Sequence, residues 1–174
     1  MLGCWFEELA PADWWRKDAA LDATLRERFG ALHAQAAAGE CWAWRATGEG
    51  RLAEVLLLDQ FSRNLYRDTP RAFAQDAMAL ALAQEAVAGG HDRALLPQRR
   101  AFLYMPYMHS ESARVHEEAL RLFSQPELAF NLDFERRHKA IVDRFGRYPH
   151  RNAILGRHST AQELAFLAEP GSSF

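Results

Sequence analysis

Signals that start and stop helices recur at short intervals along this chain, and they constrain its fold more than any other feature. Thr160 to Glu163 has the form of a capping box before an apolar run, and Thr69-Pro70 places a capping residue before a proline. Gly39 and Gly146 stand where left-handed helix ends are expected. Between these signals apolar residues return every three or four positions, and the alternation typical of strands is missing. The sequence therefore predicts an all-α protein.

The spacing of these signals also predicts how the chain is organised. No linker rich in Gly, Ser or Pro divides the 174 residues, a length that suits one domain with a core of its own. We predict a single helical domain over residues 1–174, made of six to eight short antiparallel helices stacked on one another. The expected helices cover residues 18–38, 51–67, 69–88, 97–108 with a bend or break near Pro106, 110 or 112 to about 123, 131–145, and one starting at 160.

Composition excludes several other classes of protein. Apolar residues make up 49% of the chain and the net charge is -2, so neither nucleic acid nor an anionic membrane would attract the whole molecule. No apolar run approaches the roughly 20 residues needed to span a bilayer. Cys4 and Cys41 lie too far apart for a zinc ribbon or a redox pair. The first residues lack the basic start of a signal peptide, so we expect a cytoplasmic protein.

The five tryptophans all lie in the first quarter of the sequence. A stacking platform for bases or sugars is one interpretation of such a cluster. Large aromatic side chains wedged between helix ends, with the indole N–H bonded to a loop carbonyl, are much more common. We expect this second arrangement.

Charged residues interrupt the most apolar helix of the chain. Residues 52–58 are apolar almost all round the helix, which is typical of a helix at the centre of a bundle. Asp59 and Arg63 continue the face that carries Leu52, Val55 and Leu56. Because a buried, unpaired carboxylate costs several kcal/mol, Asp59 must have a partner, and Arg63 lies one helical turn away.

Two later segments also pass from apolar to polar. Residues 102–108 are apolar and lead into His109-Ser110-Glu111, while residues 141–152 end a helix in a turn rich in arginine and histidine. Between Arg136 and Arg157 seven Lys or Arg residues face one acid, Asp143. Acidic partners must therefore come from elsewhere in the chain, and Asp59 and Glu111 are the candidates.

These three segments together carry a resemblance to a known family. The residues concerned are Asp59-Gln60-Phe61-x-Arg63-Asn64-x-Tyr66-Arg67, Phe102-Leu103-Tyr104-x-Pro106-x-x-His109-Ser110-Glu111 and Arg144-Phe145-Gly146-Arg147-x-Pro149-His150-Arg151-Asn152. They resemble the signature blocks of the bacterial domain of unknown function 924 family, over essentially the whole chain. The resemblance implies an all-helical, tetratricopeptide-like stack. It does not indicate any particular activity. The chain departs from the family pattern at Glu54, where an apolar residue is expected, and at His116, where a glutamine-like residue is expected.

The polar segments predict one internal site. Its arginines would face a carboxylate or phosphate, so we expect a module that binds a small anionic ligand or a protein or peptide partner. Mutual neutralisation of the same side chains, with a purely structural role, is the other interpretation. The candidate ligand-binding residues are Asp59, Arg63, Asn64, His109, Glu111, Arg147, His150, Arg151 and Asn152.

A metal-free, hydrolase-like enzyme is the alternative function. A carboxylate–histidine pair such as Asp59 or Glu111 with His109 or His150 can transfer protons in a cleft. The spacing of His109, Glu111 and His116 matches no compact metal motif, and no phosphate loop, dinucleotide fingerprint or nucleophile elbow is present. We therefore expect no cofactor and no bound metal. The basic stretch at 136–157 alone is a weak signal for nucleic acid, and we expect no such partner.

Overall fold

The computed structural model describes residues 1–173, and all regular structure in this part of the chain is helical. The last residue of the predicted domain, Phe174, lies outside the described residues. The α-helices are α1 Ala19–Ala37, α2 Gly48–Leu56, α3 Ser62–Leu65, α4 Asp76–Ala88, α5 Pro97–Met108, α6 Ala113–Phe123, α7 Ala129–Phe145 and α8 Ala161–Leu167. Short π turns (η1 Cys4–Glu8 and η3 Leu57–Phe61) and 3₁₀ turns (η2 Trp42–Ala46, η4 Pro70–Phe73, η5 Pro126–Leu128 and η6 Pro149–Arg151) connect or extend them. The predicted all-α class is confirmed.

Several helix ends follow the local sequence as expected. The Asp18 carboxylate accepts hydrogen bonds from the first backbone N–H groups of α1, and Gly39 follows that helix at φ 76°. Gly146 ends α7 at φ 68°. The capping box at Thr160 and Glu163 is present at the start of α8.

The central helix, predicted over 51–67, both begins and ends earlier in the chain, and it is not uniform. It begins at Gly48 because the Thr47 hydroxyl accepts a hydrogen bond from the Gly50 N–H at 3.1 Å. It then runs without a break through α2, η3 and α3 to Leu65. The π turn η3, which carries Asp59, lies in the middle of this run. Single π turns inserted in α-helices are frequent at functional sites.

Other features of the helices also differ from those predicted. The expected helix over 69–88 is divided into η4 and α4, because the Thr69 hydroxyl donates to the Tyr66 carbonyl at 2.7 Å instead of capping. The helix over 97–108 does not break at Pro106, one of the two expected outcomes there, because α5 continues through it to Met108. A proline removes one backbone hydrogen bond, and the surrounding buried side chains hold the last turn in place.

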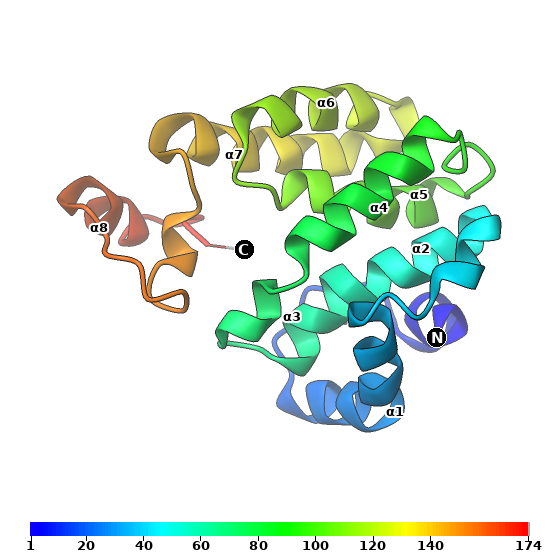
Figure 1. The fold of residues 1–174 in the computed structure, drawn as a ribbon. Coiled ribbons are helices and arrows are strands. Elements are labelled where there is room, and N and C mark those ends of the chain that lie inside the picture. Colours follow the sequence, from blue (N-terminus) through cyan, green and yellow to red (C-terminus); the bar gives the residue numbers. More distant parts are fainter. Residues whose placement is uncertain (174) are drawn as a thin grey trace.

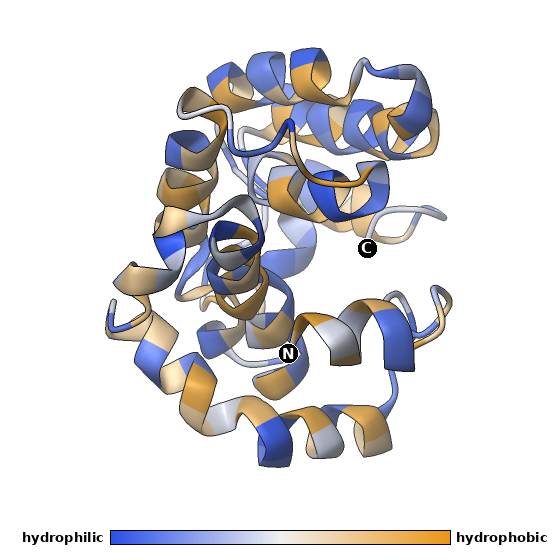
Figure 2. Ribbon diagram, turned by 90° about the vertical axis from the view of Figure 1, so that its right-hand side faces the viewer, coloured by the Kyte–Doolittle hydropathy of each residue, from blue (hydrophilic) through white to orange (hydrophobic). Residues whose placement is uncertain are grey.

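The helices stack in the order of the sequence (Figure 1). At one end α1 packs on α3 and η3, and in the middle α2 packs on α4 and α5. The α5–α6 and α6–α7 pairs extend the stack to the other end. The segment with η6 and α8 lies to one side of it. Hydrophobic and hydrophilic residues alternate along the helices in Figure 2.

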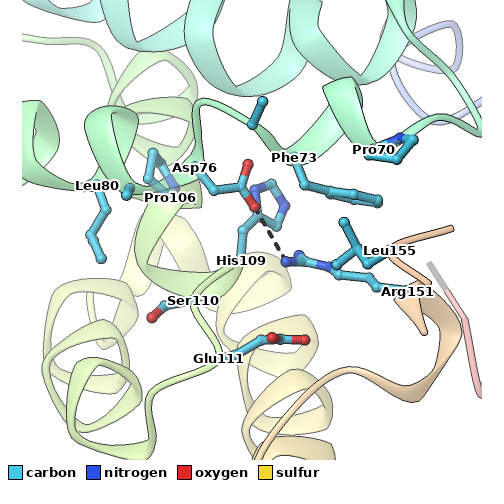
Figure 3. A pocket seen from close by; sticks show the side chains of 12 residues that line it. Pro70, Phe73, Asp76, Leu80, Pro106, His109, Ser110, Glu111, Arg151 and Leu155 are labelled. Carbon is cyan, nitrogen blue, oxygen red and sulfur yellow. Dashed lines mark hydrogen bonds and ion pairs between the residues drawn. The ribbon is translucent and has the colours of Figure 1, made fainter. Parts of the chain in front are cut away.

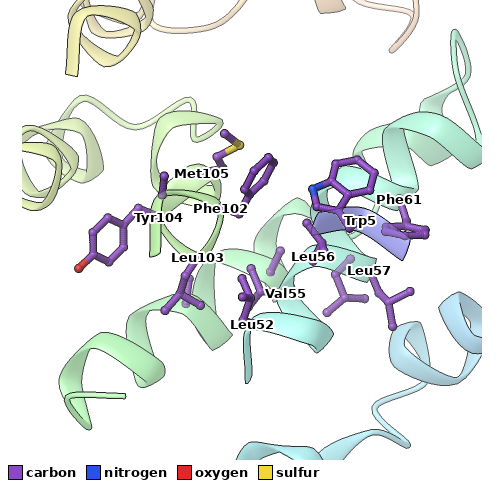
Figure 4. Packing of buried hydrophobic residues seen from close by; sticks show 14 of the residues in the cluster. Trp5, Leu52, Val55, Leu56, Leu57, Phe61, Phe102, Leu103, Tyr104 and Met105 are labelled. Atoms are coloured by element: carbon purple, nitrogen blue, oxygen red, sulfur yellow. The ribbon is translucent and has the colours of Figure 1, made fainter. Parts of the chain in front are cut away.

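The central helix supplies much of the core, as predicted. Its apolar residues from Leu52 to Leu58 are buried and pack with Trp5, Phe61 and Phe102 (Figure 4). Glu54 lies in this buried stretch, where Arg45 donates two hydrogen bonds of 2.7 Å to its carboxylate. The departure from the family pattern at Glu54 therefore leaves the helix buried.

The aromatic residues at the start of the chain are divided between core and surface. The Trp14 indole donates to the Trp5 carbonyl at 2.8 Å, which confirms the expected arrangement for this residue. Trp5 is buried, whereas Trp15 and Trp42 are exposed. Within the described residues, no helix combines the length and apolarity needed to cross a membrane.

Candidate functional site

Two cavities meet beside the polar end of the central helix. The larger cavity has a volume of about 680 Å³ and the smaller cavity about 410 Å³. Phe73, His109 and Arg151 line both, so these side chains form the wall between them. Figure 3 shows the smaller cavity, where Asp76 points toward Arg151 and His109 lies beside them.

Asp59 lies behind this wall and is held there by three side chains. Its Oδ1 lies 2.7 Å from His109 Nδ1 and 3.0 Å from Arg63 Nη1, and Gln60 Nε2 donates to its Oδ2 at 2.7 Å. Burial alone would raise the pKa of Asp59, but Arg63, His109 and Gln60 together hold it below its ordinary value. Asp59 is therefore a buried carboxylate ion, and its predicted pairing with Arg63 is confirmed.

A second carboxylate, Asp76 at the start of α4, is shared by two arginines. Arg63 binds it in a two-pronged contact of 3.0 and 3.1 Å, while Arg151 reaches it through one hydrogen bond of 3.2 Å. Burial opposes the charged form of Arg63, yet Asp59 and Asp76 raise the pKa of its guanidinium. Arg63 thus contacts both carboxylates, and Arg151 contacts only one oxygen of one of them.

Arg151 is the less neutralised of the two arginines. Its side chain lies between the rings of Phe73 and Tyr148, with the guanidinium carbon 4.7 and 4.6 Å from their centroids. The residue is 6% exposed, and its Nε has no hydrogen-bond partner among residues 1–173. Burial, and then the charge of Arg63, lower the pKa of Arg151. A cation in this state is stabilised by any anion that enters beside it.

Histidines add polar but uncharged groups to the larger cavity. His138 Nδ1 donates to the Phe134 carbonyl at 2.8 Å, and burial lowers the pKa of His138 to about 3. Burial and the charge of Arg151 lower the pKa of His150 to about 4. Both rings are neutral at neutral pH, so they offer hydrogen bonds without adding charge.

The rest of the larger cavity combines aromatic rings with basic groups. Trp15 and Phe130 line it and are 56% and 67% exposed. Arg16 and Lys17 belong to the same lining, next to Trp15 in the chain. A ligand in this cavity would meet exposed aromatic surface and positive charge together with the buried Arg151.

The structure brings most of the predicted site residues together. Arg63, Asn64, His109, His150 and Arg151 line the larger cavity, and Glu111 lines the smaller one. Asn64 is also tied to the first helix, because it donates to the Asp22 carboxylate at 2.8 Å.

Two predicted residues point elsewhere. Arg147 lines neither cavity and binds the Glu163 carboxylate at 2.7 and 2.9 Å. Asn152 is fully buried and exchanges hydrogen bonds with Ser159 and Arg157. Their partners Glu163, Ser159 and Arg157 belong to the C-terminal segment, and these contacts hold both side chains away from the cavities.

Asp59 and Glu111 were expected to neutralise the basic segment at 136–157, and only one of them does. Glu111 does so, since Arg157 binds it at 2.6 and 2.9 Å and the Tyr148 N–H donates to it at 2.7 Å. Asp59 pairs with Arg63 and His109 instead. Asp76 pairs with Arg151 and Glu163 with Arg147, while Asp133 pairs with Arg137. Glu163 was expected only as part of a helix cap, and Asp76 was not expected to be a partner.

His116, the second departure from the family pattern, lines neither cavity. It is fully buried, with Nδ1 2.6 Å from Glu135 Oε1 and Nε2 2.9 Å from the Ser110 carbonyl. Burial raises the pKa of Glu135. Within residues 1–173 no three His, Cys, Asp or Glu side chains are arranged to hold a metal ion.

Comparison with known proteins agrees with this description. A family described as bacterial proteins of unknown function, DUF924, matches residues 1–171. The chain belongs to this family. A solved structure of a protein of unknown function from Agrobacterium tumefaciens is 40% identical, with a TM-score of 0.89 over 94% of this chain and 92% of that one. No curated protein matches. DUF924 membership thus confirms the resemblance seen in the sequence, and the similar structure confirms the fold.

Proposed function

We propose that the protein binds a small anionic ligand with an aromatic or apolar part in the larger cavity. The observation that carries this proposal is Arg151, a buried arginine on the cavity wall with one ion-pair contact and a buried Nε–H without a partner. A carboxylate or phosphate oxygen would complete its hydrogen bonding.

The walls of the larger cavity support the second half of the proposal. A ligand whose anionic group reaches Arg151 would leave its remaining atoms among Phe73, Phe134 and Trp15. Aromatic walls with a few polar groups at one end are the usual composition of small-molecule sites. The cavity volume of about 680 Å³ lies within the range of such sites.

A thermal-shift experiment tests the anion site. Phosphate, sulfate, acetate and benzoate are added at the ionic strength of a chloride control. We expect them to raise the melting temperature, because a ligand that binds only the native state stabilises it by about 2.7 kcal/mol at 100 times its Kd. Benzoate is expected to act at lower concentration than acetate, since its ring contacts the aromatic walls.

Two matched variants locate the effect. Arg151→Met removes the guanidinium from the cavity wall and keeps much of the apolar stem, and the anion-dependent shift should be lost. Arg147→Met makes the same change at an arginine outside both cavities, and the shift should persist. If no anion stabilises the wild type, or if both variants respond equally, the arginines are internally neutralised and the proposal is wrong.

A further inference from the structure

The pair of His109 and Asp59 has a fixed proton arrangement. His109 Nδ1 lies 2.7 Å from Asp59 Oδ1, and Arg63 and Gln60 hold Asp59 as a carboxylate ion. Because a carboxylate ion only accepts hydrogen bonds, Nδ1 must carry the proton of this contact. In the neutral ring the other nitrogen, Nε2, then has a free lone pair.

The two members of the pair differ in access to the cavities. The Asp59 side chain is 1% exposed, whereas the His109 side chain is 15% exposed and lines both cavities. A base that reaches a cavity, oriented by a carboxylate that does not, is the arrangement by which histidine removes protons in many enzymes.

Burial keeps the ring of His109 neutral, and charges of both signs surround it. They come from Asp59 and Arg63 on the central helix, Asp76 on α4, and Arg151 on η6, with the neutral rings of His138 and His150 beside them. Burial lowers the pKa of His109, the charge of Arg63 lowers it further, and Asp59 opposes both. At neutral pH the ring is therefore available to accept a proton.

Guanidinium groups stand beside this base. Arg151 shares the wall between the cavities with His109, and Arg63 lines the larger cavity. A positive charge fixed beside a base stabilises an oxygen atom that becomes negative when a nucleophile adds to a carbonyl carbon. Cys4 and Cys41, the two thiols of the chain, are buried, and neither lines either of the two cavities described above. The nucleophile that suits this base is water.

We propose that the protein hydrolyses small carboxylic esters in the larger cavity, with His109 as the catalytic base and Asp59 as its positioning residue. This rests on the proposed function, since the anion site would hold the substrate. His109 Nε2 takes a proton from water while the water oxygen bonds to the carbonyl carbon, and the carbonyl electron pair moves to the oxygen beside the guanidinium groups. When the tetrahedral intermediate collapses, the C–O bond to the alcohol breaks. The alcohol oxygen receives the proton from His109, and a carboxylic acid is released.

The assay follows the release of 4-nitrophenolate from 4-nitrophenyl acetate and from mono-4-nitrophenyl glutarate, whose free carboxylate can reach Arg151. We expect wild type to exceed His109→Gln by about 100-fold or more in kcat, the usual contribution of a positioned base. Arg147→Met, outside both cavities, should keep the wild-type rate. Wild type should hydrolyse the glutarate ester faster than the acetate ester, and Arg151→Met should hydrolyse the two at similar rates.

A pH profile separates a base from a structural residue. The wild-type rate should fall in acid with a midpoint below 6.5, the ordinary pKa of histidine, because His109 must be neutral to act. Asp59→Asn should lower kcat at every pH more than it changes KM, because an amide N–H facing Nδ1 moves the ring proton to Nε2.

The outcomes for binding and for hydrolysis are distinguishable. If wild type is no faster than both His109→Gln and Asp59→Asn, while benzoate still raises the melting temperature of all three, the hydrolase proposal is wrong and the anion site stands. Absence of the benzoate shift from wild type would contradict both proposals. The shift also reports whether each variant is folded.

Discussion

Arginines in two neighbouring parts of this protein are neutralised in different ways. In the C-terminal segment, Arg147 binds Glu163 and Arg157 binds Glu111, each through two hydrogen bonds to its own carboxylate. At the wall between the cavities Arg63 and Arg151 share Asp76, and Arg63 takes the better geometry. Both parts are rich in arginine, yet in the second the buried Nε of Arg151 has no hydrogen-bond partner among residues 1–173.

The difference shows how a site can be told from a structural contact. An arginine with its own carboxylate fixes one chain segment against another and has little left to offer a ligand. An arginine that shares a carboxylate keeps donors and charge available. The same contrast appears among the histidines, since His116 is closed between Glu135 and a carbonyl while His109 faces the cavities.

The largest expected effect follows from the loss of Asp59, the carboxylate that Arg63 and His109 share. Asp59→Ala should lower the free energy of unfolding by about 3–5 kcal/mol, because it leaves Arg63 and His109 in a buried place without their common acceptor. Denaturant unfolding measures this loss. Glu85→Ala, an exposed acid on α4, is the control, and equal shifts in the two variants would show that Asp59 contributes nothing as a buried ion.

A smaller effect should separate the two kinds of arginine. Arg147→Met should destabilise the protein more than Arg151→Met does, because the carboxylate of Glu163, which is 2% exposed, loses a charged two-pronged partner. Arg151→Met should lie within about 1 kcal/mol of wild type, since Asp76 keeps Arg63 and a poorly neutralised buried charge is removed.

Denaturant melts of the two methionine variants, made side by side, decide this comparison. A loss in Arg151→Met as large as that in Arg147→Met would mean that Arg151 is as well neutralised as Arg147. Whether an arginine shares its carboxylate would then make no difference to the free energy of unfolding.

How much of this could be predicted depends on whether the determining contacts are local in the chain. The Thr160 capping box and the Asp59–Arg63 pair involve residues within a few positions, and the apolar pattern of residues 52–58 by itself indicates a buried helix; all three were predicted. The partners of Arg147 and Arg151 lie 16 and 75 residues away. Only the packing of the helices decides those contacts, so Glu163 and Asp76 were missed and Arg147 was placed in the site.

Acid should destabilise the protein through the buried histidines of the larger cavity. Because the pKa of His138 is lowered to about 3 and that of His150 to about 4, the unfolded chain binds more protons than the native protein below pH 6.5. Stability is therefore present above pH 6.5 and falls toward the native pKa values, by at most about 1.4 kcal/mol per pH unit for each ring. Denaturant melts between pH 7 and pH 5 measure how steeply the free energy of unfolding depends on pH. In His138→Gln this dependence should be weaker by the contribution of the His138 ring. An unchanged slope in that variant would show that His138 titrates normally.

The smallest effect tests whether the C-terminal segment is purely structural. Thr160→Ala removes the hydroxyl that accepts the Glu163 N–H in the capping box, and should cost about 1 kcal/mol, the usual value of a helix cap. Because Glu163 also binds Arg147, the change should loosen the contacts of α8 and leave the wall between the cavities as it is. Hydrogen exchange should therefore speed up in residues 161–167 and stay unchanged around His109, while the benzoate-dependent thermal shift keeps its wild-type size. If Thr160→Ala loses the shift, the C-terminal segment helps to build the anion site. The arginines that have their own carboxylates could then no longer be treated as separate from Arg63 and Arg151, which share Asp76.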